Sequence, residues 1–265
     1  MVSRNRAFST ERQETYSTEA EAIEAIDLDT DGLHLVVDLR ATDDPHVDID
    51  LRPFLTSDAG LIVASKFQLF VKRGVDIFAS IFFLAVLSPI LALTALAVAL
   101  TSAGPTIFKQ QRVGRDGRHF QFYKFRSMSA TAEDEREALS DRNESNGPVF
   151  KIFADPRITP IGKFIRKTSI DELPQFWNVL RGEMSLVGPR PPLPGEVEHY
   201  SAWERQRLAV RPGVTGIWQV SGRADLDFET WVTMDIQYIE EWRPWLDFKL
   251  LARTIPAVLS GRGAY

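Results

Sequence analysis

The sequence predicts an α+β protein that is mostly helical, lies in one leaflet of a membrane through a re-entrant helix, and carries a small β-hairpin. Three observations lead to this fold class. A long uncharged apolar run contains a Ser-Pro pair. A segment of period-two alternation with an Asp-Gly turn follows it, which is typical of a hairpin. Segments of helical period occupy much of the remaining chain.

The composition is that of a globular chain with two regions of different charge. Its 265 residues can bury a sizeable core, and the absence of cysteine excludes disulfides, thiolate nucleophiles and cysteine-bound metals. Residues 1–65 carry 14 Asp and Glu against 5 Lys and Arg, whereas residues 66–265 carry 22 against 26. The basic balance of the second region suits anionic partners such as phosphates or lipid head groups.

We therefore divide the chain at this change of composition. Residues 1–65 are interpreted as an acidic N-terminal extension, partly disordered, with a helix at 18–26 and a strand at Leu33–Arg40. Residues 66–265 are interpreted as a membrane-associated domain that carries the activity, and its re-entrant helix covers about 74–101.

The apolar run from Ile77 to Leu100 contains 24 residues without a charge. As one helix it would reach roughly 36 Å, enough to cross a bilayer. Pro89 removes a backbone hydrogen bond in its middle, and Ser88 can satisfy the carbonyl that is released. Basic residues flank both ends: Lys66, Lys72 and Arg73 before the run, and Lys109, Arg112 and Arg115 after it. The positive-inside bias then places both ends on the cytoplasmic side, so we favour a re-entrant helix over a spanning one.

The remaining elements follow from local patterns. Alternation on both sides of Asp116-Gly117 predicts the hairpin, and residues 129–145 are expected to form a charged surface helix or a mobile loop. Helices are predicted at 163–167, from about Glu172 through Leu180 with an end near Gly182, and in the amphipathic segments 228–242 and 245–259. All six tryptophans follow residue 176, which fits either a membrane interface or a buried core.

The adjacent acids Asp171 and Glu172 are the strongest candidates for chemistry. Ser169-x-x-Glu172 matches a capping box, but Pro174 fits a helix start better if Asp171 is the N-cap. A carboxylate at that position stays ionised, and the free N–H groups around it attract anions. Basic residues that could neutralise phosphates lie nearby in the sequence: Arg157, Arg166, Lys167 and Arg190.

Such a site handles phosphate beside a membrane. Mg²⁺ favours carboxylate and phosphate oxygens, so it is the natural cofactor. One acid can attack phosphorus while its neighbour binds the metal or orients the first. The residues by themselves do not identify the reaction.

A set of ordered motifs narrows the interpretation. They are KRGVD at 72–76, SP at 88–89, FKQQRVG at 108–114, FYKFRSM at 122–128, RITPIGKFIRKTSIDELPQ at 157–175, NVLRGEMSLVGPRP at 178–191 and RPGVTGIWQVSGR at 211–223. Over roughly residues 66–265 the chain resembles the bacterial sugar transferase family, the monotopic polyprenyl-phosphate phosphoglycosyl transferases.

The resemblance implies a reaction and its substrates. A UDP-sugar would give its sugar 1-phosphate to polyprenyl (undecaprenyl) phosphate and release UMP, through a phosphosugar bound to the aspartate of the dyad. The product would start the assembly of an exopolysaccharide or another glycan. The protein would lie against inner-leaflet lipid of the cytoplasmic membrane, with its catalytic domain on the cytoplasmic face.

The resemblance also implies roles for single residues. Asp171 would be the nucleophile and Glu172 its partner, both near Mg²⁺. Arg166 and Arg190 match arginines attributed to phosphate or nucleotide contact, and Asp247 matches a later family acid. Ser88-Pro89 would break the re-entrant helix, and the basic pair Lys72-Arg73 would lie at the head-group boundary.

Two other functions remain open from the sequence. The chain could be a non-enzymatic membrane scaffold of a glycan-assembly complex, or a metal-dependent phosphohydrolase that uses water as the acceptor. Nothing in the motifs suggests a nucleic-acid partner, and a homo-oligomer is possible.

Overall fold

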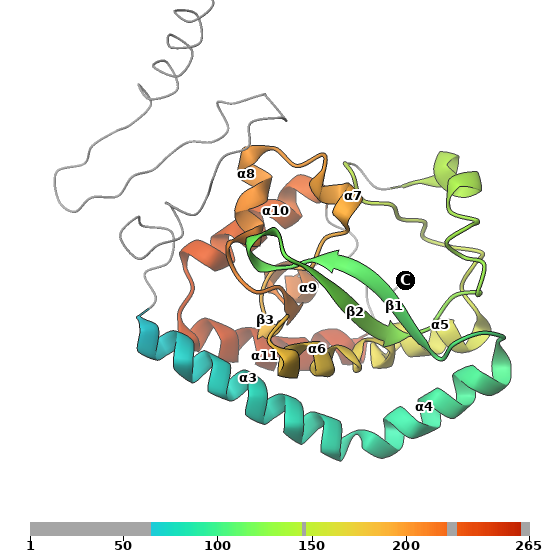
Figure 1. The fold of residues 1–265 in the computed structure, drawn as a ribbon, viewed down its shortest axis with the longest axis horizontal. Helices are drawn as coiled ribbons and strands as arrows, with labels where there is room; N and C mark the ends of the chain where they lie inside the picture. The colour runs from blue at the N-terminus through green and yellow to red at the C-terminus, as the bar shows by residue number, and fades with distance from the viewer. Residues whose placement is uncertain (1–64, 145–146, 222–226, 261–265) are drawn as a thin grey trace, which may run out of the picture.

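The structure is a computed structural model that describes residues 65–144, 147–221 and 227–260. The predicted acidic extension, with its helix at 18–26 and its strand at 33–40, falls almost wholly outside the described residues. The described part is mostly helical with two small sheets (Figure 1). This confirms the mostly helical α+β class and the small hairpin of the prediction.

Two helices form a bent arm beneath the rest of the protein (Figure 1). They are α3 (Lys66–Val86) and α4 (Ser88–Thr101), and their axes differ by 62° at the break. Pro89 stands in the first turn of α4, where it has no N–H to give to the Ala85 carbonyl. Ser88 Oγ donates to that carbonyl at 2.8 Å instead. The bend therefore lies at the Ser-Pro pair.

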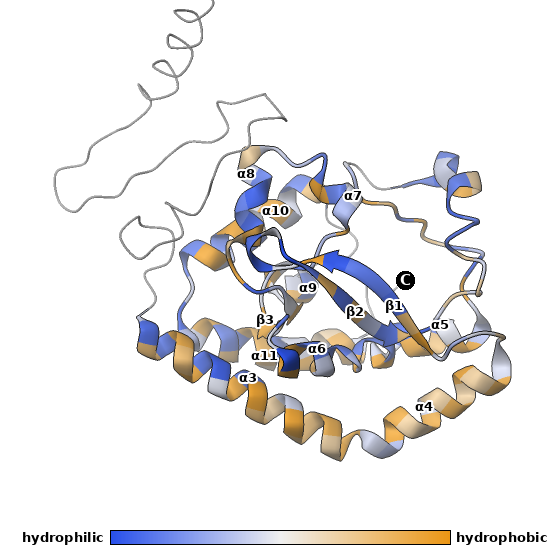
Figure 2. Ribbon diagram, in the orientation of Figure 1, coloured by the Kyte–Doolittle hydropathy of each residue, from blue (hydrophilic) through white to orange (hydrophobic). Residues whose placement is uncertain are grey.

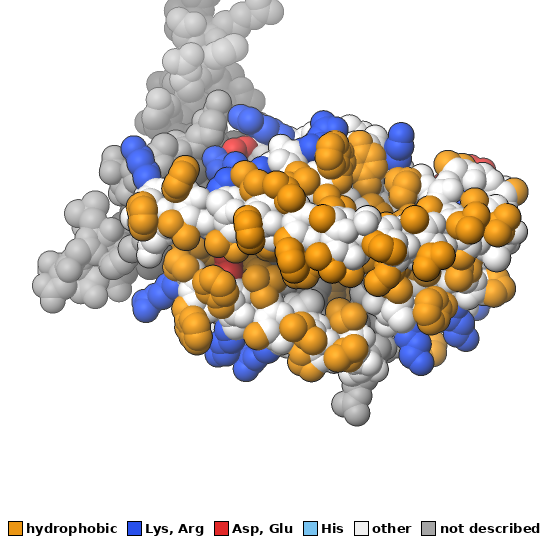
Figure 3. All heavy atoms as spheres, turned by 90° about the horizontal axis from the view of Figure 1, so that it is seen from below, with side chains coloured by type: hydrophobic (Ala, Val, Ile, Leu, Met, Phe, Trp, Pro, Cys, Tyr) orange, Lys and Arg blue, Asp and Glu red, His pale blue; other side chains and the backbone are white. Residues whose placement is uncertain are grey.

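The arm carries an apolar surface. Figure 2 shows hydrophobic residues along α4 and the second half of α3, and Figure 3 shows their side chains on the lower face with Lys and Arg at its margins. Large exposed members are Phe67, Phe70, Phe78, Ile81, Phe82, Leu93, Leu96 and Leu100. Within the described residues no single helix is long and apolar enough to span a membrane, although the bent pair together meets that test. Its entry into one leaflet stays a prediction.

The predicted hairpin is confirmed. Strands β1 (Ile107–Val113) and β2 (His119–Phe125) pair antiparallel. Ile107 lies opposite Phe125, and Val113 lies opposite His119. The short turn η2 (Arg115–Gly117) joins them. Asp116 and Gly117 have φ values of 58° and 71° there, which Asp tolerates and Gly adopts freely.

A second sheet was not predicted. Strands β3 (Ser185–Val187) and β4 (Gly213–Thr215) form a short parallel pair. The close approach of the two segments requires glycine at 213, because a Cβ there would lie only 2.1 Å from the Gly188 nitrogen. The Gly213 N–H donates to the Pro189 carbonyl at 2.8 Å, which holds the segment that leads to Arg190.

The other helices build the body above the arm. Two predictions near the C-terminus are confirmed by α10 (Phe228–Glu240) and α11 (Pro244–Ser260). The segment expected as a surface helix or loop consists of turns and the short helix η3 (Glu137–Arg142). The remaining elements are α5 (Pro160–Lys167), η4 (Ile170–Glu172), α6 (Gln175–Arg181), α7 (Pro194–Val197), α8 (Ala202–Arg205), η5 (Gln206–Ala209) and α9 (Ile217–Ser221).

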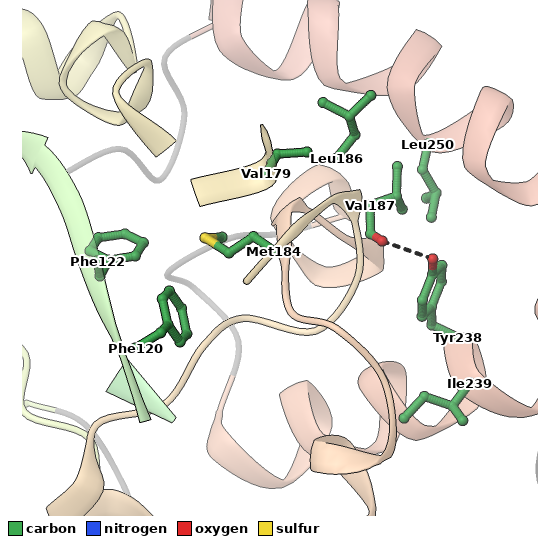
Figure 4. Close-up of a cluster of buried hydrophobic side chains, with 9 residues drawn as sticks. All are labelled: Phe120, Phe122, Val179, Met184, Leu186, Val187, Tyr238, Ile239 and Leu250. Carbon is green, nitrogen blue, oxygen red and sulfur yellow. Dashed lines mark hydrogen bonds between the residues drawn. The ribbon is translucent and has the colours of Figure 1, made fainter. Parts of the chain in front are cut away.

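The main core joins the hairpin to the helices. Phe120 and Phe122 of β2 point toward Met184, and Tyr238 of α10 donates its hydroxyl to the Val187 carbonyl at 2.9 Å (Figure 4). The buried-core alternative that the sequence raised for the tryptophans is confirmed for two of them. Trp218 and Trp231 stack at 4.6 Å in a second buried cluster, whereas Trp245 is 76% exposed.

The basic pair at the start of the arm has partners inside the protein. The head-group role expected of Lys72 and Arg73 stays a prediction, and both donate to acceptors of the body. Lys72 Nζ forms an ion pair with Asp247 at 2.6 Å, and Arg73 donates to the carbonyls of Val179 and Leu180 at 2.7 and 2.9 Å. Half-buried cations need such partners because they have lost water. Lys72 and Arg73 therefore hold α3 to the body.

A buried acid makes a third attachment of α3. Asp76 accepts from the Ser185 hydroxyl and from the Leu186 N–H, both at 3.0 Å. A carboxylate with these two donors in a buried position is costly to release, so the contact fixes α3 against β3.

One glycine decides how closely α5 approaches the hairpin. A Cβ on Gly162 would lie 1.8 Å from the Ser127 carbonyl oxygen, which follows β2. Gly162→Ala should therefore push α5 away and cost about 1–3 kcal/mol of unfolding free energy. Thermal unfolding of the detergent-purified protein measures this loss.

The matched control is Gly74→Ala in α3, where nothing lies within 4 Å of an added Cβ. It should leave stability unchanged or raise it, since Ala favours helix more than Gly does. Equal unfolding temperatures for the two variants would show that the close contact of α5 is unimportant.

Candidate active site

A cavity of about 310 Å³ opens beside the hairpin. Seven cations line it, against the two carboxylates Glu133 and Glu196. Such an excess of positive charge, carried mostly by guanidinium groups, favours a ligand with several phosphate oxygens. The cations are Arg112, Lys124, Arg126, Arg136, Arg157, Arg166 and Arg190.

The acidic dyad lies in the turn between α5 and α6. We expected a helix from about Glu172 with Asp171 as its N-cap, and this is wrong. The chain first closes the short turn η4, and α6 begins at Gln175 with Pro174 as its N-cap residue. Pro174 has no N–H to continue the turn as an α-helix. The capping-box alternative also fails, because Ser169 has a φ of 55° and its side chain makes no cap hydrogen bond.

The end predicted for this helix is confirmed. Gly182 follows Arg181 with a φ of 82°, the left-handed conformation that commonly ends helices. The predicted helix at 163–167 is also present, and it begins earlier, at Pro160, because Thr159 Oγ1 accepts from the Gly162 N–H.

Asp171 is 7% exposed, whereas Glu172 is exposed. Burial raises the pKa of Asp171 above its ordinary value, and Lys124 and Arg166 oppose that rise. We had expected a helix N-terminus to favour its charged form, but the groups that oppose the rise are mainly two cations from β2 and α5. Both cations line the cavity, so the cavity borders the two groups that interact with Asp171, although Asp171 itself is not part of the lining.

Lys124 is a functional residue that the sequence reading missed. Burial lowers its pKa to about 8, although Asp171 and Glu172 both act to raise it. A signal was present, since Lys124 shares its strand face with the buried Phe120 and Phe122. A lysine at an inward position of an alternating strand is unusual without an acidic partner.

Arg126, two residues after Lys124, is a second residue of the cavity lining that the sequence reading missed. It is buried and donates to the Ser102 carbonyl at 2.7 Å and to the Ser102 hydroxyl at 2.8 Å, with a further bond to the Pro105 carbonyl. Because Ser102 caps α4, Arg126 connects the end of the bent arm to the lining of the cavity.

The predicted phosphate-binding residues divide into two groups. Arg166, Arg190 and Arg157 line the cavity, whereas Lys167 is exposed and does not. Arg157 is also buried in an ion pair with Asp155 at 2.6 Å, and this pair holds its guanidinium in place.

Arg190 is held by a buried acid. Arg190 Nη1 donates to Glu196 Oε2 at 3.1 Å, and the Leu193 N–H donates to the same oxygen at 2.9 Å. Burial alone would raise the pKa of Glu196, but Arg190, Arg112 and the backbone donor together lower it. Glu196 therefore stays ionised and fixes the guanidinium direction.

A metal has limited support from the protein alone. Among the described residues, no three His, Asp or Glu side chains are grouped so that they could hold a metal ion. Mg²⁺ is commonly bound by one or two carboxylates together with substrate phosphates, and the dyad offers two carboxylates next to a phosphate-sized cationic cavity. Mg²⁺ at Asp171 and Glu172 stays a prediction.

A cationic cavity whose Lys124 and Arg166 interact with a buried aspartate favours a phosphate-bearing ligand. The comparison with known families identifies the class further. The sequence model of the family described as bacterial sugar transferase matches residues 67–261. The chain belongs to this family.

Several curated proteins are similar to the chain. A galactosyl transferase CpsE of Streptococcus agalactiae is 51% identical over 198 residues, 74% of this chain and 44% of that protein. An undecaprenyl-phosphate galactose phosphotransferase of Salmonella typhimurium is 44% identical over 211 residues, which are 77% of this chain and 43% of that protein. The exopolysaccharide production protein ExoY of Rhizobium meliloti is 38% identical over 198 residues, which are 73% of this chain and 88% of that protein. The chain thus spans less than half the length of the first two relatives and most of the third.

The pKa of Lys124 predicts how anion binding changes with pH. Lys124 is charged below about pH 8, so UDP, whose phosphates are fully ionised in this range, should bind about tenfold more weakly at about pH 9 than at about pH 7. Lys124→Arg should retain tight binding to higher pH. Titration calorimetry across this range measures both.

Lys167→Ala is the control, since Lys167 lies outside the lining of the cavity. It should show the wild-type pH dependence. A wild-type affinity that does not change between about pH 7 and about pH 9 would exclude Lys124 as the titrating group.

Proposed function

We propose that the chain is a phosphoglycosyl transferase. It moves a sugar 1-phosphate from a UDP-sugar to polyprenyl (undecaprenyl) phosphate and releases UMP, which starts the assembly of an exopolysaccharide or other glycan. The observation that carries the proposal is the buried Asp171 beside the cavity cations Lys124 and Arg166, in a chain of the bacterial sugar transferase family. Relatives named as undecaprenyl-phosphate galactose and glucose phosphotransferases support the acceptor.

The first step is an attack by the Asp171 carboxylate oxygen on the phosphorus that bears the sugar. A new bond joins that oxygen to phosphorus, and the bond from phosphorus to the bridging oxygen of the diphosphate breaks. UMP leaves with that electron pair, and the phosphosugar stays on Asp171 as an acyl phosphate. Lys124 and Arg166 favour the charged form of the attacking carboxylate, and the other cavity arginines neutralise the diphosphate.

The second step uses the same site. A phosphate oxygen of the lipid attacks the phosphorus of the acyl phosphate, the bond to Asp171 breaks, and the carboxylate is restored. One sugar diphosphate is exchanged for another, so no ATP is required. Soluble and lipid substrates can use the cavity in turn because UMP leaves before the lipid reacts.

Glu172 is placed to assist without attacking. It is exposed beside the buried nucleophile and interacts with Lys124. With the donor's phosphates it would hold Mg²⁺, which supplies positive charge to the diphosphate when bound.

The membrane location is part of the proposal. The bent arm would enter the inner leaflet of the cytoplasmic membrane and return, so that the cavity faces the cytoplasm near the head groups. The exposed apolar face of α3 and α4 and the basic side chains at its margins support this placement (Figure 3).

The reaction is tested by incubating the protein with Mg²⁺ and a panel of UDP-sugars without lipid. We expect a burst of UMP equal to the enzyme and an intact-mass increase of one phosphosugar on Asp171. Asp171→Asn should abolish the burst, because an amide does not attack phosphorus. Asp134→Asn changes an exposed acid outside the lining of the cavity and should keep the burst.

Other outcomes identify other functions. Continuous UMP release without lipid would indicate a phosphohydrolase, and no release with any sugar would indicate a scaffold. An adduct on a residue other than Asp171 would overturn the assignment of the nucleophile.

Membrane topology is tested with single cysteines, which the wild-type chain lacks. Ser65→Cys and Ala103→Cys lie at the two ends of the arm, and Ala103 avoids the Ser102 contact with Arg126. Both should react with a membrane-impermeant maleimide only from the cytoplasmic side. Reaction from opposite sides would show that the arm spans the membrane.

A further inference from the structure

A second cavity continues from the first. It has a volume of about 850 Å³ and lies beside α7. The two cavities share five lining residues, so they form one groove. The shared residues are Gln110, Glu133, Arg136, Leu193 and Glu196.

The charge of the groove changes along its length. Arg136 is the one Lys or Arg among the described residues that line the second cavity, whereas the first has seven such residues. Two glutamines, prolines, glycines and the two carboxylates form most of the second lining. Phosphates therefore favour the first cavity, and an uncharged group rich in hydroxyl and N–H donors fits the second.

The two shared carboxylates are not equivalent. Glu196 is 2% exposed and already accepts from Arg190 and Leu193. Glu133 is exposed at the junction, where the Gln110 amide donates to it at 3.4 Å. An ionised carboxylate has acceptor capacity for further donors, so Glu133 can bind a pair of adjacent hydroxyls.

A planar cation stands at the same junction. The Arg136 guanidinium lies over the Phe150 ring, with its carbon 5.3 Å from the ring centroid. A guanidinium plane held in this way can stack on a heteroaromatic base.

The direction of the groove separates the two ends of a nucleotide sugar. Lys124 and Arg166, which interact with Asp171, line the first cavity alone. Phe108 is the strand partner of Lys124, and Gln110 is two residues further along β1, about 7 Å away at the usual rise. Beyond it, α7 lies near the tip of β1 and away from the bent arm (Figure 1).

We propose that the second cavity binds the nucleoside of the donor, with the ribose hydroxyls on Glu133 and the base on Arg136. This inference rests on the proposed function, because the attack by Asp171 keeps the sugar and its phosphorus at the opposite end. The departing nucleotide then already lies in the part of the groove that is remote from the lipid.

Calorimetry at fixed Mg²⁺ tests the assignment with three probes: UDP, 2′,3′-dideoxy-UDP and pyrophosphate. Glu133→Gln should weaken UDP binding about tenfold, because a neutral amide is a weaker acceptor for hydroxyls. Pyrophosphate binding should not weaken, and loss of the Glu133 charge beside Arg112 and Arg157 would if anything strengthen it. The wild-type protein should lose a similar factor with the dideoxy nucleotide, and the variant should not distinguish it from UDP. Glu137→Gln, an exposed acid of η3 that lines neither cavity, is the control.

Two results would overturn the assignment. Equal UDP affinities of the Glu133→Gln and Glu137→Gln proteins would remove Glu133 from the nucleoside site. An equal loss for pyrophosphate would show that Glu133 acts on the phosphate cations. The proposed function is judged separately, by the UMP burst of the wild-type protein, so either idea can fail while the other stands.

Discussion

A carboxylate that is buried in this fold keeps its charge only if cations lie beside it, and the site is built around that requirement at Asp171. Strand β2 contributes Lys124, and α5 contributes Arg166. The close contact at Gly162 brings α5 to the end of β2. The dyad turn then leaves Asp171 between the two elements. A buried carboxylate has lost the water that would weaken its nucleophilicity, and the neighbouring cations oppose the rise in its pKa that burial causes.

Contacts of α3 and α4 also join the bent arm to the cavity. Lys72 and Asp76 attach α3 to α11 and β3, and Arg126 attaches the end of α4 to the cavity lining. Each contact pairs a cation or a carboxylate with backbone or oppositely charged groups in a partly dry environment, where such hydrogen bonds are costly to break. The arm and the cavity are therefore held in one fixed arrangement. The proposed reaction with a lipid phosphate would need such an arrangement, because the height of Asp171 above the lipid would determine whether that phosphate reaches it.

The groove extends this logic to the donor. Its cations gather near the dyad, and its amides and Glu133 lie further along β1. The donor carries a sugar on one side of its diphosphate and a nucleoside on the other. The charge difference along the groove would place the diphosphate at the cations before any chemistry occurs. Orientation of this kind matters for a displacement at phosphorus, since the attacking and leaving oxygens must lie roughly in line.

Local patterns in the sequence determined several features of this protein. The Ser-Pro pair produced the bend, Asp116-Gly117 produced the hairpin turn, and helical period located α10 and α11, because each depends on interactions within a few residues. The family motifs pointed to the dyad. Tertiary structure decided the rest: the β3–β4 pair, the start of α6 beyond Pro174, the internal partners of Lys72 and Arg73, and the gathering of Lys124, Arg126 and Glu133 around one cavity. These features depend on burial and on contacts between residues far apart in the chain, and neither is encoded in any short stretch of sequence.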